Sequence, residues 1–270
     1  MTRLVTAAVL APLLWVTIKL AAPWVFVGVA SAVILAASWE CYRMLRSGGA
    51  EPLVTLGLLA TAALLASFAL PDPRFAPGHV LTGAVLAAMA LAMVRRATPR
   101  QMLDALGSTM LPVLLVGATM GYVLVLRRAP GADGSDLVLL LFLCVICGDT
   151  LAYYVGSLLG RHRMAPIISP RKSWEGFAGA IAGSIGGALV AHAWFYQRLP
   201  LGHAIALGLV LALAGVLGDL AESVVKRACG VKDSSTVLPG HGGWFDRTDS
   251  LLFAAPILYH YHVAFLRGLA

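Results

Sequence analysis

Nine apolar runs follow one another along the chain, separated by short polar stretches. Each contains 16 to 23 residues, close to the ~20 residues with which a helix crosses a bilayer. The runs occupy residues 4–20, 23–39, 53–70, 79–94, 109–126, 137–159, 177–195, 201–220 and 251–266. The pattern predicts an all-α fold, a polytopic transmembrane helical bundle of about nine spans. Because only Ala21 and Ala22 separate the first two runs, these form either two spans or one hairpin, and the span count is fixed only to within one.

The composition supports this fold and leaves little room for a separate soluble domain. Of the 270 residues, 59% are hydrophobic and 12% are charged, whereas soluble domains average about half apolar and about a quarter charged. We divide the chain into residues 1–135, with about five spans, and residues 136–270, with about four spans and the longest polar loops. The first run resembles a signal peptide, but it continues into the next run, so we expect it to remain as a span.

Lysine and arginine are distributed unevenly between the two sides that alternating loops define. The side with the N-terminus carries fourteen of them and the other side six. Because positive charge stays in the cytoplasm, we predict a cytoplasmic N-terminus and an external C-terminus, in a multi-pass protein of the cell (inner) membrane. The formal net charge of +7 does not indicate nucleic acid, since so apolar a chain cannot line a phosphate backbone. A membrane lipid or a small anionic substrate is the expected partner.

Two features inside the spans concern packing. Gly179, Gly183 and Gly187 recur at i, i+4 and i+8 and predict a face on which a neighbouring helix packs closely. Cys144 and Cys147 lie in an apolar run without a second pair of Cys or His. We therefore interpret the two cysteines as small buried apolar side chains, not as a zinc or redox site.

The two longest loops on the predicted cytoplasmic side, residues 160–176 and 218–250, differ in composition from the rest of the chain. The second contains five of the thirteen acidic residues, interleaved with Lys, Arg and His. Carboxylates bind a hard divalent cation, and cationic side chains neutralise phosphate oxygens, so this composition predicts a site for a metal-bound polyphosphate. Asp149 lies near the middle of a span, where a charge costs about 2.5–3.5 kcal/mol. It either stabilises the bundle or, as we favour, lines a polar cavity open to the cytoplasm.

Helical spacing gathers part of this chemistry on one face. If the eighth helix continues beyond residue 220, then Asp219, Glu222, Ser223 and Lys226 lie at i, i+3, i+4 and i+7 and share that face. The alternative is a solvated helix end with a Glu222–Lys226 pair, and spacing alone does not choose between the two. Asp219 lies within about one turn of the predicted bilayer edge, where a charge is disfavoured unless function or a partner retains it.

A turn-rich stretch, Pro-Gly-His-Gly-Gly at residues 239–243, follows this face along the chain. Its backbone N–H groups can approach phosphate oxygens closely because glycine has no side chain. Asp246, Arg247 and Asp249 come directly after it, before the last predicted span. One of these carboxylates can meet Asp219 across a metal ion only if the eighth and ninth helices pack side by side.

Residues 223–249, SVVKRACGVKDSSTVLPGHGGWFDRTD, closely resemble the signature of the phosphatidate cytidylyltransferases, or CDP-diacylglycerol synthases, S-x-x-K-R-x4-K-D-x-S-x2-L-P-x-H-G-G-x-x-D-R-x-D. The loop ISPRKSWEG at residues 168–176 and the stretch GDTLAYYVGSLLGR from Gly148 are also similar to that family. The departures are small: Trp244 stands where a smaller aliphatic residue is common, and Arg171 and Ser173 where Lys and Thr are usual. The resemblance implies a helical, membrane-embedded protein over the whole chain.

The resemblance also implies a reaction: transfer of the cytidylyl group of CTP to phosphatidic acid, with Mg2+, giving CDP-diacylglycerol and pyrophosphate. It implies Asp219 and Asp246 as magnesium ligands, with Asp249 and Glu222 as further candidates. Lys226, Arg247 and His241 complete the expected catalytic set. The expected substrate-binding residues are Lys172, Ser173, Ser223, Arg227, Lys232, Asp149, Gly242 and Gly243.

Three other functions compete with this interpretation. A CTP-dependent lipid kinase would release CDP and leave no nucleotide on the lipid. An ion-coupled transporter predicts polar residues along several spans, whereas here they gather at one end. A membrane prenyltransferase with an aspartate-rich box normally has an Asn-containing partner motif, and the chain has no asparagine. The sequence leaves the oligomeric state open, with a homodimer as one candidate.

Overall fold

The computed structural model describes residues 15–70, 72–94, 98–130, 133–235, 237 and 242–267. Contacts divide the chain into two compact units. The first comprises Met1–Thr17, Ala21–Val125 and Val225–Thr248, and the second comprises Ile18–Leu20, Leu126–Val224 and Asp249–Ala270. The division predicted at residues 135/136 follows chain order alone, and the structure adds that residues 225–248 pack with the N-terminal helices.

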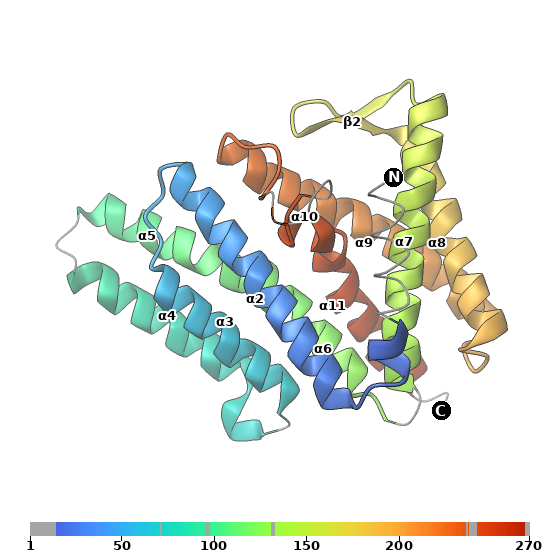
Figure 1. Cartoon of the computed structure of the whole chain (residues 1–270), viewed down its shortest axis with the longest axis horizontal. Helices are drawn as coiled ribbons and strands as arrows, with labels where there is room; N and C mark the ends of the chain where they lie inside the picture. Colours follow the sequence, from blue (N-terminus) through green and yellow to red (C-terminus); the bar gives the residue numbers. More distant parts are fainter. Residues whose placement is uncertain are drawn as a thin grey trace. The chain divides into compact units, whose positions relative to one another are not determined.

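The first unit consists of helices linked by short turns (Figure 1). They are α2 (Pro23–Ser47), α3 (Val54–Ala69), η1 (Pro73–Phe75), α4 (Pro77–Val94), α5 (Pro99–Pro112), η2 (Val113–Ala118), α6 (Tyr122–Arg127, whose last two residues belong to the second unit) and α10 (Phe245–Thr248). Tyr42 of α2 donates a hydrogen bond to the carbonyl of Thr109 at 2.6 Å, and the Thr109 hydroxyl accepts one from the Leu53 N–H at 2.8 Å. These buried contacts join α2 to α5 and α5 to the start of α3. Helices α3 and α5 therefore hold α2 in place.

The second unit contains the other long helices and one small sheet. Its elements are α7 (Asp133–Leu159), β1 (Arg163–Ala165), β2 (Ser169–Ser173), α8 (Trp174–Trp194), α9 (Leu201–Ala228, as far as Val224), α11 (Leu251–Tyr261) and η3 (His262–Leu266). Strands β1 and β2 pair antiparallel, with Arg163 opposite Ser173. The sequence predicts only a loop at residues 160–176, because strands as short as β1 and β2 show no clear alternation of apolar and polar positions.

The predicted glycine face is confirmed. Helices α7 and α8 lie side by side (Figure 1). A Cβ atom at Gly179 would lie 2.8 Å from the Leu151 carbonyl oxygen and one at Gly187 would lie 3.0 Å from that of Leu143, while one at Gly183 would overlap the Cys147 carbonyl oxygen. The three glycines therefore let the two backbones approach more closely than side chains would permit.

This close approach predicts a sharp difference between two neighbouring glycines of α8. Gly183→Ala should lower the free energy of unfolding by about 1–3 kcal/mol, because the new methyl group meets the backbone of α7. A Cβ at Gly186 has no atom within 4 Å, so Gly186→Ala should be neutral or stabilising by about 0.5–1 kcal/mol through the lower backbone entropy of Ala. Thermal unfolding of the detergent-solubilised variants measures both, and equal midpoints would contradict the prediction.

Among the described residues, six helices are long and apolar enough to cross a membrane, and α3 is a shorter apolar helix of 16 residues. This confirms an all-α transmembrane fold, while the count of nine spans and the polar cavity stay predictions. Several helices extend beyond the apolar runs. Helix α5 begins at Pro99, ten residues before the predicted span, because Thr98 and Gln101 form a capping box and Pro99 occupies the first turn. The first predicted span, residues 4–20, lies mostly outside the described residues.

Candidate active site

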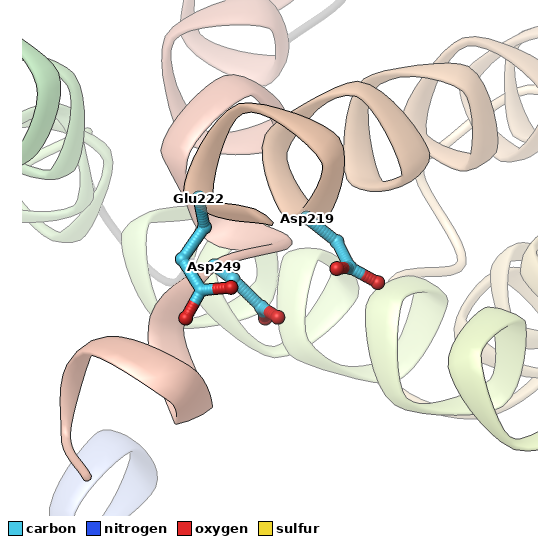
Figure 2. A group of neighbouring side chains, drawn as sticks. All are labelled: Asp219, Glu222 and Asp249. Carbon is cyan, nitrogen blue, oxygen red and sulfur yellow. The ribbon is translucent and has the colours of Figure 1, made fainter. Parts of the chain in front are cut away.

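Three carboxylates meet in the second unit. Asp219 and Glu222 lie one helical turn apart on α9, and Asp249 lies in the turn before α11. One oxygen from each lies within 4.8 Å of the others, and Figure 2 shows the three side chains directed to the same side of α9. Glu222 is fully buried, whereas Asp219 and Asp249 are half-buried. The cluster thus combines one carboxylate withdrawn from solvent with two that a ligand can reach.

Gly218 of α9 makes this meeting possible, because a Cβ atom there would overlap the carbonyl oxygen of Asp249. A Cβ at Gly215 would lie 3.7 Å from the Cβ of Ser250, an ordinary van der Waals distance. Gly215, Gly218 and Glu222 fall on one helical face by their spacing, so the bare part of this face contacts the turn that carries Asp249. The turn that carries Asp249 therefore contacts α9 directly, while side-by-side packing of the eighth and ninth predicted helices stays a prediction.

The hairpin between α7 and α8 supplies a cation to the cluster. Lys172 of β2 places its Nζ atom 2.7 Å from Oδ2 of Asp219, and the same ammonium donates to the Val216 carbonyl at 3.4 Å. On the other side, the Ser223 hydroxyl lies 3.5 Å from Oδ1 of Asp219. Lys172, one of the expected substrate-binding residues, therefore lies beside the carboxylate cluster, while its role in substrate binding stays a prediction.

Asp149 is linked to the same cluster through a residue that the sequence analysis missed. The Ser250 hydroxyl donates to Oδ2 of Asp149 at 3.1 Å and lies 3.3 Å from Oδ1 of Asp249. Ser250 directly follows the Asp-Arg-Thr-Asp motif, and this adjacency was the available signal. Asp149 of α7 thus faces a polar neighbour within its own unit, as a residue lining a polar site would.

A second polar cluster lies in the first unit, around Asp246 of α10. Its Oδ1 accepts a hydrogen bond from Lys226 at 2.8 Å, and its Oδ2 accepts from the N–H groups of Ser234 and Gly243, each at 2.8 Å. Gly242 has φ +76°, and a Cβ there would lie 2.6 Å from Oδ2 of Asp246. The loop before α10 comprises residues 229–244, and its described residues Ser234, Gly242 and Gly243 therefore surround the Asp246 carboxylate, with glycine required next to it.

Glu40 of α2 belongs to this second cluster, and the sequence analysis did not identify it. Its carboxylate accepts hydrogen bonds from the hydroxyls of Ser234 and Ser235, at 2.9 and 2.7 Å, and from the Phe245 N–H at 3.0 Å. Glu40 is a single acidic residue at the end of an apolar run, almost 200 residues before its partners. The signal available in the sequence was a single charged residue directly after an apolar run, since such a charge is usually kept by a partner or a function.

The remaining predicted site residues have other surroundings. Ser173 caps α8 by accepting from the Gly176 N–H at 3.1 Å, and Arg227 donates to the Val231 carbonyl at 3.1 Å. Lys232 and Arg247 are exposed, and His241 lies outside the described residues. The roles assigned to these residues, including Asp246 as a metal ligand, stay predictions.

The carboxylate cluster fits a divalent cation. Carboxylates whose oxygens lie within 4.8 Å of one another repel by at least about 3 kcal/mol per pair at an effective dielectric constant of about 20, and Lys172 offsets one of the three negative charges. A hard divalent cation prefers carboxylate oxygens and supplies the missing positive charge. Asp219, Glu222 and Asp249 therefore form a suitable donor set for Mg2+.

Long apolar helices, with carboxylates and lysines gathered at helix ends and in loops, define a polytopic helical membrane protein whose polar site suits a metal ion and phosphate groups. The chain belongs to the cytidylyltransferase family, whose model matches residues 1–265. This finding confirms the family resemblance of the signature at residues 223–249.

The chain is also similar in sequence to several relatives named phosphatidate cytidylyltransferase. One from Synechocystis sp. is 30% identical over 292 residues, covering 98% of this chain and 97% of the relative. One from Mycobacterium bovis is 44% identical over 123 residues, covering 46% of this chain and 40% of the relative. One from Staphylococcus epidermidis is 44% identical over 127 residues, covering 47% and 49%. In the last two matches the chain spans less than half the length of the relative.

Proposed function

We propose that this protein transfers the cytidylyl group of CTP to phosphatidic acid, producing CDP-diacylglycerol and pyrophosphate. Membership of the cytidylyltransferase family and the names of the relatives support the reaction type and the two substrates. The structural observation that carries the proposal is the cluster of Asp219, Glu222 and Asp249 with Lys172 beside it. Carboxylates for a cation and an ammonium for phosphate are the groups that such a reaction needs.

The reaction requires charge neutralisation more than proton transfer. An ionised phosphate oxygen of phosphatidic acid attacks the α-phosphorus of CTP, and the bond from that phosphorus to the bridging oxygen of the β-phosphate breaks. Pyrophosphate leaves with the electron pair of the broken bond. Since both reactants are anions, cationic side chains that hold them in line lower the barrier. We assign this role to Lys172 and Lys226, with the exposed Arg247 as a further phosphate contact.

Magnesium is part of the proposal. Asp219, Glu222 and Asp249 would hold the ion, and the family signature adds Asp246 as a ligand. When bound, Mg2+ supplies positive charge that neutralises phosphate oxygens. Lys172 orients Asp219 through their ion pair, and Ser250 orients Asp249 through its hydroxyl and its N–H, which donates to Oδ1 of Asp249 at 2.6 Å.

The labelled nucleotide distinguishes the proposal from its nearest alternative. We expect purified protein, given phosphatidic acid and CTP labelled in the α-phosphate, to place the label in a lipid product and to release unlabelled pyrophosphate. A lipid kinase would leave the label in CDP. Label in CDP would overturn the proposal, and omission of phosphatidic acid is the control.

We also propose that the site faces the cytoplasm of a cell with this protein in its inner membrane, where CTP is available. The fourteen-to-six distribution of Lys and Arg supports a cytoplasmic N-terminus and an external C-terminus. A reporter fused after Ala270 should therefore be active only outside the cytoplasm. Reporter activity only inside the cytoplasm would refute this topology.

The homodimer stays a proposal, which cross-linking in native membranes tests.

A further inference from the structure

We propose that Glu40 is a positioning residue for the cytidylyl transfer: it holds the loop before α10 in the conformation that fixes the Lys226–Asp246 pair. This inference rests on the proposed function. It concerns a residue of the N-terminal half, far in sequence from the family signature. Glu40 contacts the loop and not the reacting atoms, so its effect passes through Asp246.

The first observation in support is that the buried carboxylate of Glu40 has hydrogen-bond donors at both of its oxygens. The residue is 3% exposed, and both of its carboxylate oxygens accept hydrogen bonds from the loop. The donors are Ser234 and Ser235 of the loop and Phe245, the first residue of α10. A buried carboxylate is tolerated only with such donors, and hydrogen bonds to an ionised acceptor are the strong ones. One side chain of α2 therefore ties the loop to the start of α10.

The second support is a direct link from Glu40 to Asp246. The Ser234 hydroxyl lies 2.9 Å from Oε2 of Glu40 and 2.8 Å from Oδ2 of Asp246. Between these carboxylates lies Gly243, whose N–H donates to Asp246 and whose Cβ, if present, would overlap Glu40. Any shift of the Glu40 carboxylate therefore displaces groups that hold Asp246, which in turn holds the ammonium of Lys226.

Contacts that do not involve Glu40 hold α2 in place, and this is the third observation in support. The Tyr42 hydroxyl bonds to the carbonyl of Thr109, and a Cβ at Gly57 of α3 would overlap that same hydroxyl. Because these contacts hold α2 without the help of Glu40, removing the carboxylate should release the loop and leave the helix in place. A loss of activity with α2 still in place would therefore indicate a positioning role for Glu40 and not a general contribution to stability.

The test compares Glu40→Ala with Glu40→Gln. Glu40→Ala should lower kcat by on the order of 10- to 100-fold, because displaced catalytic groups lose in-line geometry. The KM for CTP should change by less than about 3-fold. A change this small means that no direct contact with the CTP phosphates has been removed. Glu40→Gln should restore most of the activity, since its amide oxygen accepts from two donors and the Ser235 hydroxyl can accept from its amide N–H. Glu51→Ala, an exposed acidic residue of the same unit, is the matched control and should behave like the unmodified protein.

A second variant keeps the test sharp if Glu40→Ala is poorly folded. Ser235→Ala removes one donor but leaves the Glu40 carboxylate in place, so it should give a milder loss of kcat. Combined with Glu40→Ala, its effect should be smaller than the product of the two single effects, because both changes remove the same hydrogen bond. Unchanged kcat in Glu40→Ala, or full multiplicativity in the double variant, would overturn the proposal.

A readout without substrate separates this inference from the proposed function. Trypsin can cleave after Lys232, which is exposed in the loop, and we expect faster cleavage there in Glu40→Ala, with unchanged cleavage after the exposed Arg163 of β1. If the unmodified protein forms no CDP-lipid, the proposed function fails, whereas equal cleavage rates at Lys232 in both proteins would show that Glu40 does not hold the loop.

Discussion

Replacing Asp219 with Asn is expected to lower magnesium-supported CDP-lipid formation by about 100- to 1000-fold, the usual effect of removing one charge-stabilising group from a catalytic site. The substitution keeps the shape of the side chain but removes a negative charge from the cluster with Glu222 and Asp249, and it leaves Lys172 without its carboxylate partner. Activity as a function of Mg2+ concentration, together with size-exclusion profiles that report folding, measures the effect. Asp104→Asn is the control, because Asp104 is exposed and should tolerate the change.

The double variants test whether the carboxylates act as one unit. Asp219→Asn combined with Asp249→Asn should be much less harmful than the product of the single effects, because both residues serve one metal-phosphate arrangement. The same comparison with Asp246→Asn tests the prediction, made from the family signature, that Asp219 and Asp246 share an ion. Multiplicative losses would argue against a shared ion, and full activity in a single variant would remove that residue from the site.

The second large effect is expected at the pair formed by Lys226 and Asp246. Their side chains are 12% and 6% exposed, with 2.8 Å between Nζ and Oδ1. Removing one partner of a buried pair leaves an uncompensated charge, which costs about 3–5 kcal/mol of stability. Lys226→Ala should therefore lower both the thermal midpoint and the turnover. Arg74→Ala, at an exposed arginine of the same unit, should alter neither.

The double variant Lys226→Ala with Asp246→Asn separates stability from catalysis. Because Asp246→Asn removes the charge that Lys226→Ala leaves without its partner, the thermal midpoint should recover relative to Lys226→Ala. The turnover should stay low, since the ammonium assigned to phosphate is still missing. Recovery of turnover together with stability would show that the pair has a structural role only.

The positions of most helices were predictable from the sequence because their cause is local. An apolar run of about 20 residues must satisfy its backbone polar groups within a helix to cross a membrane. Helices α7 and α9 contain their predicted runs, and α8 contains all but the last residue of its run. The glycine face of α8 was predictable for the same reason, since three glycines at helical spacing share one side whatever lies opposite. The boundaries were less predictable: residues 99–108, a segment of mixed polar and apolar residues, extend α5 from a capping box at Thr98.

The sequence by itself determined the class of fold, the family through residues 223–249, and the set of charged residues from which the site is built. Only the tertiary structure decided which of them meet. Asp249 joins Asp219 and Glu222 because Gly218 lets the turn before α11 approach α9, and Lys226 pairs with Asp246 because the loop before α10 folds around that carboxylate. Glu40 shows the physical reason most clearly. Its partners lie almost 200 residues away, and helical periodicity reports neighbours only within a few turns, so contacts at that separation arise from packing alone.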